Sequence, residues 1–418
     1  MPHGCLRNSK PVLMVLVLAL GFAAAKPALA RSISSAHRNP ALAVQDLSGH
    51  ESGPTLGDTI AGQHSIEDCN ALDPRPAPPS SVHDLRPDDI RVVAALGDSI
   101  TAGFGAKGRT SKSPISLKTI YENRGVSFFI GGDPDAKTVS RFIQHYRPSL
   151  VGYSHGDHLA ELCYGPLCPP YQYHRPNDEL NAAQSGAMVM NLHQELDHLI
   201  QEMEHNDDID MDHDFKLLNI FIGSNDACFG CDLASETTWL SPAVYEEHMR
   251  ALLGKIRRKI PRTIVNIVQQ FNISQVWDLT HGNDYCNQLR DEGRTFECKC
   301  AFLPLELGQV TRKRMDSLVQ SYNRRLLTIW EDYQAEVPDE GFALVLDPGF
   351  TQIRLREWPI EMLSNVDCFH PSVAAHELMA ATVWNNLYRN FASKQRHADP
   401  SVPMPIFCPE NESRIQTR

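Results

Sequence analysis

The chain has 418 residues, of which 42% are hydrophobic and 22% are charged, and its formal net charge is −12. These values are ordinary for a globular protein with a real core, and the length allows two domains or one large domain with insertions. The acidic balance argues against nucleic-acid binding, which needs a basic face for phosphates, and it gives no general attraction to anionic membranes.

The first thirty residues have the pattern of an export signal. Arg7 and Lys10 charge the start of the chain, an apolar run covers residues 11–25, and residues 28–30 (Ala-Leu-Ala) supply the small-x-small pattern that signal peptidase reads. The apolar run is shorter than the roughly 20 residues of a membrane span. We therefore predict a signal peptide at residues 1–30, with a retained signal anchor as the alternative.

The segments that flank the predicted folded domain are polar. Residues 31–68 are rich in Ser, Gly, His and Pro without sustained periodicity, which favours a pro-segment or flexible arm. Residues 410–418 form a polar tail, and no second long apolar run occurs in the sequence. We expect the folded domain at residues 69–409, with neither a transmembrane tail nor a hydrophobic-tail lipid anchor.

Short apolar runs alternate with helical patterns through this domain. Strands are expected at residues 92–96, 217–222, 263–268 and 342–346. Helices are expected at residues 186–204, 242–259, 310–335 and 372–391. Apolar strands that alternate with helices predict an α/β fold whose parallel sheet is covered on both faces.

Two stretches do not follow this alternation. Residues 141–178 hold many aromatic residues, several prolines and two cysteines, and residues 277–304 hold three cysteines and several charges. We interpret both as long insertions tied by disulfides, on the rim of the functional site.

Cysteine usage fits an oxidising compartment. Of the eleven cysteines, Cys5 falls in the predicted signal, which leaves an even number. Disulfides are the leading interpretation, and their pairing cannot be deduced from sequence. Close pairs such as Cys228 and Cys231 lack the companion Cys or His spacing of a zinc site. Sequons at Asn272 and Asn411 fit the secretory route and predict glycosylation.

The acidic run at residues 204–214 contains alternating aspartates, which suggests a calcium loop. An EF-hand loop that starts at Asp208 needs Gly at its sixth position and Glu at its twelfth, and those positions are His213 and Asn219. We therefore expect a solvated loop and no metal there.

Ser99 is a candidate nucleophile because of its place after a predicted strand. It stands in Gly97-Asp98-Ser99, directly beyond the run 92–96, and ligands of α/β sheets bind at the carboxyl ends of strands. The tripeptide alone is a weak signal, since a turn with a helix cap would look the same.

A nucleophilic serine needs a base, and the base needs an orienting carboxylate. Asp367 and His370 are three residues apart, so one helical turn would place them side by side. Pro371 could then open the next helix as its first residue. The alternative is a helix-capping aspartate beside an ordinary histidine.

Two segments could stabilise an oxyanion. Asn225 follows the predicted strand 217–222 and offers a side-chain amide, and Gly186 offers a backbone N–H that no Cβ obstructs. Both positions could also be simple turn residues.

These signals occur in an order that resembles the GDSL, or SGNH, hydrolase family. The resembling blocks are Gly97-Asp98-Ser99, Gly186, Gly223-x-Asn225-Asp226 and Asp367-x-x-His370. The resemblance implies Ser99 as nucleophile, His370 as general base and Asp367 as its orienter. It also implies an oxyanion hole made by the N–H groups of Ser99 and Gly186 with Asn225. The implied fold is a flavodoxin-like three-layer α/β/α sandwich with a five-stranded parallel sheet.

Further stretches are similar to the phospholipase B branch of that family. They are residues 81–87, 92–103, 129–133, 148–154, 297–302 and 367–370. This similarity implies a secreted enzyme that hydrolyses acyl esters of phospholipids and lysophospholipids at a lipid surface, without metal or cofactor. Ser224 departs from the branch, which usually has Gly there. The single catalytic unit and polar tail also mean that permanent membrane attachment is not carried over.

Ser154 is a rival nucleophile in Gly152-x-Ser154-x-Gly156, the pattern of an α/β-hydrolase elbow. That elbow needs a full strand before it and a helix after it. Pro148 shortens the preceding strand, and the prolines at residues 166–170 prevent a helix. Two other functions stay open: a carboxylesterase for small or sugar-linked esters, and a non-catalytic lipid-binding protein of the same fold.

Overall fold

The four apolar runs predicted as strands form one parallel sheet in the computed structural model. The structure describes residues 65–109, 120–169, 171–230, 239–292, 297–303 and 305–418. The strands are β1 (Ile90–Gly97), β4 (Phe215–Phe221), β5 (Thr263–Val268) and β6 (Phe342–Asp347), and they lie side by side in that order. Nearly every strand residue is buried, as expected for parallel strands that are covered on both faces.

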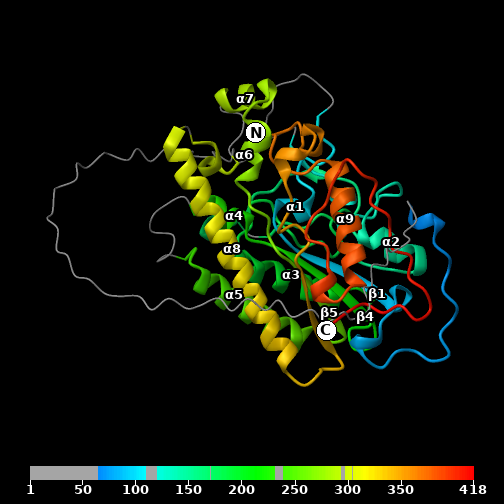
Figure 1. Cartoon of the computed structure of the whole chain (residues 1–418). Helices are drawn as coiled ribbons and strands as arrows, with labels where there is room; N and C mark the ends of the chain where they lie inside the picture. Colours follow the sequence, from blue (N-terminus) through cyan, green and yellow to red (C-terminus); the bar gives the residue numbers. More distant parts are fainter. Residues whose placement is uncertain (1–64, 110–119, 170, 231–238, 293–296, 304) are drawn as a thin grey trace, which may run out of the picture. The chain divides into compact units, whose positions relative to one another are not determined.

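Helices cover both faces of this sheet (Figure 1). Val93 and Ala95 of β1 pack in the same apolar cluster as α2 (Val139–Tyr146) and α9 (Val373–Leu387). The alternate β1 residues, such as Ala94, pack in a second cluster with three other helices. Those helices are α3 (Leu192–Glu204), α5 (Pro242–Lys259) and α8 (Leu305–Ala335). The predicted three-layer α/β/α architecture is therefore confirmed.

Local signals explain where the helices begin. Ser241 caps α5 by accepting from the Val244 N–H, Pro242 is the first helical residue, and the last turn carries three cations, so the predicted bounds 242–259 are those observed. The helix predicted at residues 186–204 begins only at Leu192. Gly186 adopts a left-handed backbone (φ 85°) and a 3₁₀ turn at Val189–Asn191 precedes the helix.

The sheet has four strands among the described residues, whereas the family resemblance implied five. Beside β1, the chain makes only isolated parallel bridges, at Val151 and at Asn181. Gly152 turns the chain away from the sheet with φ 95°, and a Cβ there would lie 2.2 Å from the Val93 carbonyl oxygen. Two short pieces of chain therefore accept hydrogen bonds from the outer edge of β1 in place of a fifth strand.

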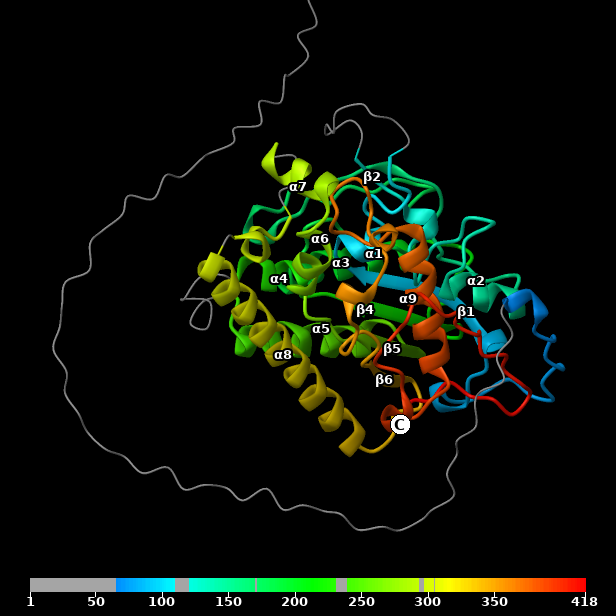
Figure 2. The ribbon, with the colours of Figure 1, turned by 45° about the horizontal axis from the view of Figure 1, so that its top comes forward.

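The two predicted insertions contain short elements of their own. Residues 141–178 begin inside α2 and contribute β3 (His158–Leu159), which pairs with β2 (Tyr121–Glu122). The stretch 277–304 overlaps α6 (Gln275–Thr280) and contains α7 (Asp284–Asp291). In a second view, α6, α7 and β2 lie with α1 (Ser99–Ala102) at one end of the sheet (Figure 2). That end is the carboxyl end of the strands, since α1 directly follows β1.

Disulfides tie these segments together, as the cysteine usage predicted. Among the described residues they join Cys69 to Cys408, Cys163 to Cys168, Cys228 to Cys298, and Cys286 to Cys368. Cys231 and the Cys300 side chain lie outside the described part. Cys228, which belongs to the close pair considered for zinc, is bonded to Cys298 and not available as a metal ligand.

The ends of the chain differ in what the structure describes. The predicted signal peptide and almost all of the predicted arm lie outside the described residues. The arm's last residues form a 3₁₀ turn at Ile66–Asp68, and Ile66 is buried in the core. In the predicted tail, Ile415 is buried and its N–H donates to the Leu85 carbonyl. No helix within the described ranges has both the length and the apolar character needed to span a bilayer.

Truncation in the middle of the sheet should cost substantial stability. Leu218 of β4 is 1% exposed in the apolar cluster beneath α3, α5 and α8. We expect Leu218→Ala to lower the free energy of unfolding by about 2–5 kcal/mol, because it loses buried apolar contacts and leaves a cavity. Urea unfolding measures the effect. The matched control is Leu307→Ala on α8, where the side chain is 61% exposed, and an equal loss in both variants would contradict the prediction.

Candidate active site

Ser99 is the first residue of α1 and lies directly beyond β1. The Asp98 carboxylate caps the short helix by accepting from the Ile100 N–H at 3.0 Å. Gly97 has no room for a side chain, because a Cβ there would lie 2.6 Å from the Phe221 carbonyl oxygen. The turn therefore presents the Ser99 side chain and its N–H, which belongs to the first helical amides that lack an intrahelical acceptor.

His370 links Ser99 to Asp367. Its Nε2 lies 2.7 Å from Ser99 Oγ, and its Nδ1 lies 2.5 Å from an Asp367 carboxylate oxygen. All three side chains are largely buried. The structure thus brings together three predicted residues that are up to 271 positions apart in the sequence, in the arrangement of a serine, a base and an orienting acid.

The loop that carries Asp367 and His370 is not the helical turn predicted from their spacing. Cys368 between them has a left-handed backbone (φ 56°), and the other Asp367 oxygen accepts from the N–H groups of Phe369 and His370. α9 starts at Val373 with Ser372 before it, so Pro371 does not open the helix. The carboxylate itself therefore organises the loop, in an Asx-type turn.

Several charges determine the protonation of His370. Burial alone would lower the pKa of His370, but the carboxylates of Asp367, Glu297 and Asp98 outweigh burial and raise this pKa to about 9. The imidazole also packs against the Phe104 ring, with ring centroids 4.5 Å apart. The acidic groups around the imidazole therefore favour its protonated form.

The two predicted oxyanion donors lie in connected segments. Asn225 belongs to α4 (Ser224–Phe229), which follows β4, and its side-chain amide donates to the Ala187 carbonyl at 2.9 Å. A Cβ at Gly186 would lie 2.6 Å from the Cys163 carbonyl oxygen, so only glycine fits there. The neighbouring Gln184 N–H donates to the Gly97 carbonyl at 3.1 Å, which ties this loop to the turn before Ser99.

Buried acids support these loops. Asp226 accepts from the Val189 N–H, and burial raises the pKa of Asp226 to about 7. Glu195 accepts from the Gly97 N–H at 2.9 Å, and burial raises its pKa well above the ordinary value. The sequence pattern did not reveal Glu195. Its one signal is a carboxylate on the apolar face of the predicted helix 186–204.

Ser154, the rival nucleophile, is fully buried away from this arrangement. Its hydroxyl donates to the Arg124 carbonyl at 2.9 Å and lies 3.4 Å from the Asn181 amide. The hydroxyl thus joins the insertion to segments that precede and follow it in the chain.

Glu297, Asp367 and His370 form a tight group whose donor atoms lie within 4.8 Å of one another. Their residue types could hold a metal ion. Both ring nitrogens of His370 already face protein partners, however, so we interpret the group as part of the Ser99 site.

The two predicted glycosylation sites have different surroundings. Asn272 is partly buried, and Ser274 of its sequon donates to Asp316 at 2.7 Å. Asn411 exchanges hydrogen bonds with Asp73 through its side-chain amide.

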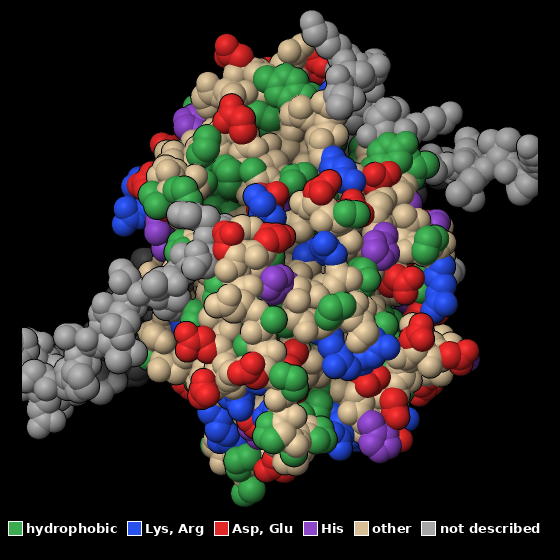
Figure 3. All heavy atoms as spheres, turned by 90° about the vertical axis from the view of Figure 1, so that its right-hand side faces the viewer, with side chains coloured by type: hydrophobic (Ala, Val, Ile, Leu, Met, Phe, Trp, Pro, Cys, Tyr) green, Lys and Arg blue, Asp and Glu red, His purple; other side chains and the backbone are tan. Residues whose placement is uncertain are grey.

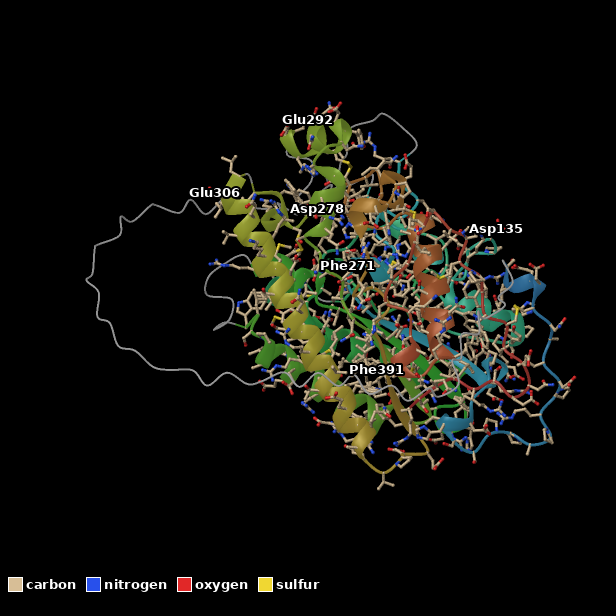
Figure 4. The ribbon with its side chains drawn as sticks, viewed as in Figure 1. Asp135, Phe271, Asp278, Glu292, Glu306 and Phe391 are labelled. Atoms are coloured by element: carbon tan, nitrogen blue, oxygen red, sulfur yellow. A yellow bond between two sulfur atoms is a disulfide. The ribbon has the colours of Figure 1, made fainter. Side chains whose placement is uncertain are left out.

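An apolar pocket of about 40 Å³ adjoins the site. His370 and Ser224 are its polar lining residues, and the rest of the lining is apolar, with Phe271, Trp358 and Met379 among the larger side chains. Phe271 lies near the centre of the molecule in Figure 4. The pocket therefore offers an apolar group a place directly beside the imidazole.

A family model for GDSL-like lipase/acylhydrolase proteins matches residues 93–383, which include every residue of this site. The chain belongs to the GDSL-like lipase/acylhydrolase family. The family assignment confirms the resemblance seen in the sequence and supports an ester hydrolase.

Known relatives of this GDSL chain include two mammalian proteins. Human membrane-associated phospholipase B1 is 29% identical over 372 residues, 87% of this chain and 24% of the relative. The rat protein of the same name is 29% identical over 392 residues, 90% of this chain and 25% of the relative. The chain thus spans about a quarter of the length of these relatives.

Solved structures with partial similarity to this GDSL chain include two Streptomyces proteins. Phospholipase A1 from Streptomyces albidoflavus NA297 is 16% identical with a TM-score of 0.32, over 69% of this chain and 94% of that chain. An extracellular lipase from Streptomyces rimosus is 15% identical with a TM-score of 0.30, over 68% of this chain and 94% of that chain.

The charge on Asp367 should raise the pKa of His370. We expect Asp367→Asn to lower the His370 pKa by about one pH unit or more, because a neutral amide no longer favours the imidazolium. NMR titration of labelled histidine measures this pKa in the intact protein. Asp135→Asn is the control, since Asp135 lies on an exposed turn (Figure 4). An unchanged His370 titration in the Asp367 variant would contradict the expected coupling.

Proposed function

We propose that this chain is a secreted serine hydrolase that cleaves acyl ester bonds of phospholipids and lysophospholipids through an acyl-enzyme on Ser99. The observation that carries the proposal is the line of hydrogen bonds from Ser99 to His370 and from His370 to Asp367. The lipid class is supported by the two phospholipase B1 relatives.

The reaction proceeds in two halves. His370 Nε2 takes the proton of Ser99 Oγ while that oxygen attacks the acyl carbonyl carbon. The N–H groups of Ser99 and Gly186, with the Asn225 amide, stabilise the charge on the carbonyl oxygen. The Asn225 amide can do so because it has two hydrogens and donates one to Ala187. His370 then gives its proton to the leaving alcohol, and a water molecule releases the fatty acid by the same route.

The apolar pocket supports an acyl group beside His370, and its size favours a second candidate function. A volume of about 40 Å³ is small beside the roughly 300–1,000 Å³ of pockets that hold drug-sized ligands. Without rearrangement it suits a short acyl group, so a carboxylesterase for small or sugar-linked esters is the runner-up. A non-catalytic lipid-binding protein would not need the three aligned side chains.

Secretion is supported by the predicted signal peptide and by four disulfides among the described residues. In this proposal residues 31–68 are an arm, residues 69–409 are the hydrolase domain, and Asn272 and Asn411 carry glycans. Figure 3 shows cationic side chains interspersed with acidic ones on the face that it presents. Such a mixed face gives nucleic acid no continuous basic surface, in keeping with a lipid or small-ester substrate.

Product analysis tests both the nucleophile and the substrate. Wild-type protein is expected to release both fatty acids from phosphatidylcholine and the remaining one from lysophosphatidylcholine. Ser99→Ala should abolish release, whereas Ser154→Ala should largely retain it, because the hydrogen bonds of the Ser154 hydroxyl do not involve His370. Mass spectrometry of the products gives the readout. Activity that survives in Ser99→Ala and disappears in Ser154→Ala would refute the nucleophile. Turnover of small esters alone would support the carboxylesterase.

Removal of the Asn225 amide should slow the chemical step. We expect Asn225→Ala to reduce kcat on a small chromogenic ester about 10²- to 10³-fold, because one donor to the developing oxyanion is lost. KM should change little, since the donor acts mainly in the transition state. Thermal unfolding of the variant serves as the control for folding. A kcat within threefold of wild type would argue against this role.

A further inference from the structure

A second carboxylate, that of Glu297, lies against the His370–Asp367 pair. One of its oxygens is within 4.8 Å of a His370 ring nitrogen and of an Asp367 oxygen. The side chain is partly buried. Glu297 is far from both partners in the sequence, and its proximity to them arises only in the fold.

The residues that follow Glu297 are held by a disulfide and by apolar packing. The next residue, Cys298, is bonded to Cys228, which lies three positions beyond Asn225 on α4. Cys298 and Ala301 are buried in a small apolar cluster with Met315 and Val319 of α8. Glu297 is therefore fixed to the same helix that presents Asn225, and its distance from His370 follows from that attachment.

Glu297 and Asp367 share an unusual local geometry. Each directly precedes a disulfide-bonded cysteine with a left-handed backbone, φ 45° at Cys298 and φ 56° at Cys368. Non-glycine residues adopt this region infrequently and at an energetic cost. At both positions the strained residue follows a carboxylate that lies beside the same imidazole, which points to a function for the second carboxylate.

We propose that Glu297 is a positioning residue that acts through His370, adding its negative charge to that of Asp367 to stabilise the imidazolium formed when Ser99 gives up its proton. This inference rests on the proposed serine mechanism and adds no atom or proton to it. The effect is electrostatic: an anion about 5 Å from an imidazole, in a largely buried site, favours the charged ring.

The other groups around His370 allow the effect of Glu297 to be isolated. The titratable groups that interact with the imidazole are Asp367, Glu297, Asp98 and His376. Burial lowers the pKa of His376 to about 3, and its Nδ1 accepts from the Phe128 N–H at 3.2 Å, which favours the neutral ring. Burial raises the pKa of Glu297, and the His370 imidazolium opposes that change.

The sign of the effect follows from the chemistry. Ser99 can lose its proton only to neutral His370, so the reaction rate rises as the pH passes the His370 pKa. An anion beside the ring raises that pKa, and its removal must move the acidic limb of the profile to lower pH. Removal also destabilises the imidazolium in the transition state, so the rate at high pH must fall.

The test is the pH dependence of Ser99 modification by a fluorophosphonate, measured on the full chain. For Glu297→Gln we expect the midpoint to move down by about one pH unit and the alkaline plateau to fall about tenfold. Glu297→Asp retains the charge and should keep a midpoint near that of wild type. Glu306→Gln is the matched control, because Glu306 is exposed in the first turn of α8 (Figure 4).

Each outcome distinguishes the inference from the proposed function. A lower plateau with an unchanged midpoint in Glu297→Gln would indicate a structural role and overturn the inference. If this variant fails to fold, Glu297→Ala provides the same comparison. Normal labelling of Ser99 without lipid hydrolysis would refute the proposed substrate and leave the Glu297 test intact. A wild-type chain that is not labelled at Ser99 would overturn both.

Discussion

The hydrogen bond between Ser99 and His370 joins the turn after β1 to the loop before α9, and most of the surrounding structure fixes these two segments at that distance. Parallel strands bring their carboxyl ends to one edge, which gives the first approximation. Finer control comes from contacts of the second loop. Ser364 Oγ donates to the Gly105 carbonyl at 2.6 Å, and Cys368 is bonded to Cys286 of α7. The loop that carries the imidazole is thus anchored both to the segment that follows α1 and to α7.

Buried acids hold the turns and loops that surround the site. Asp98, Glu195 and Asp226 each accept from a backbone N–H in a turn or loop next to a proposed functional residue. Burial raises the pKa of Asp98 to about 6 and that of Asp226 to about 7. A raised pKa in the folded state stabilises the fold at acid pH, and this contribution is lost as the pH rises through those values. The proposed mechanism needs neutral His370, which is favoured at higher pH. The stability that these acids give to the loops and the basicity needed for catalysis therefore favour different pH ranges.

The fold was predictable where the signals are local. The four strands and α5 were found because apolar runs, the Ser241 cap and the Pro242 start report on neighbouring residues alone. Two short pieces of chain lie along β1 where the resemblance implied a fifth strand. This difference was not predictable, because it depends on how Gly152 meets the edge of β1. In the site, motif order indicated Ser99 and His370. Glu297 was missed as a site residue because its place depends on a disulfide partner 70 positions away, and spacing carries no information about such a contact.

The disulfide between Cys69 and Cys408 has a topological consequence. It joins two residues 339 positions apart, so the polypeptide between them is a closed ring. The ring persists when the fold melts, and an unfolded ring samples fewer conformations than an open chain of the same length. It also changes what one proteolytic cut can do. A cut anywhere between the two cysteines opens the ring into a linear molecule whose pieces remain covalently joined, so the sheet does not lose a strand by dissociation.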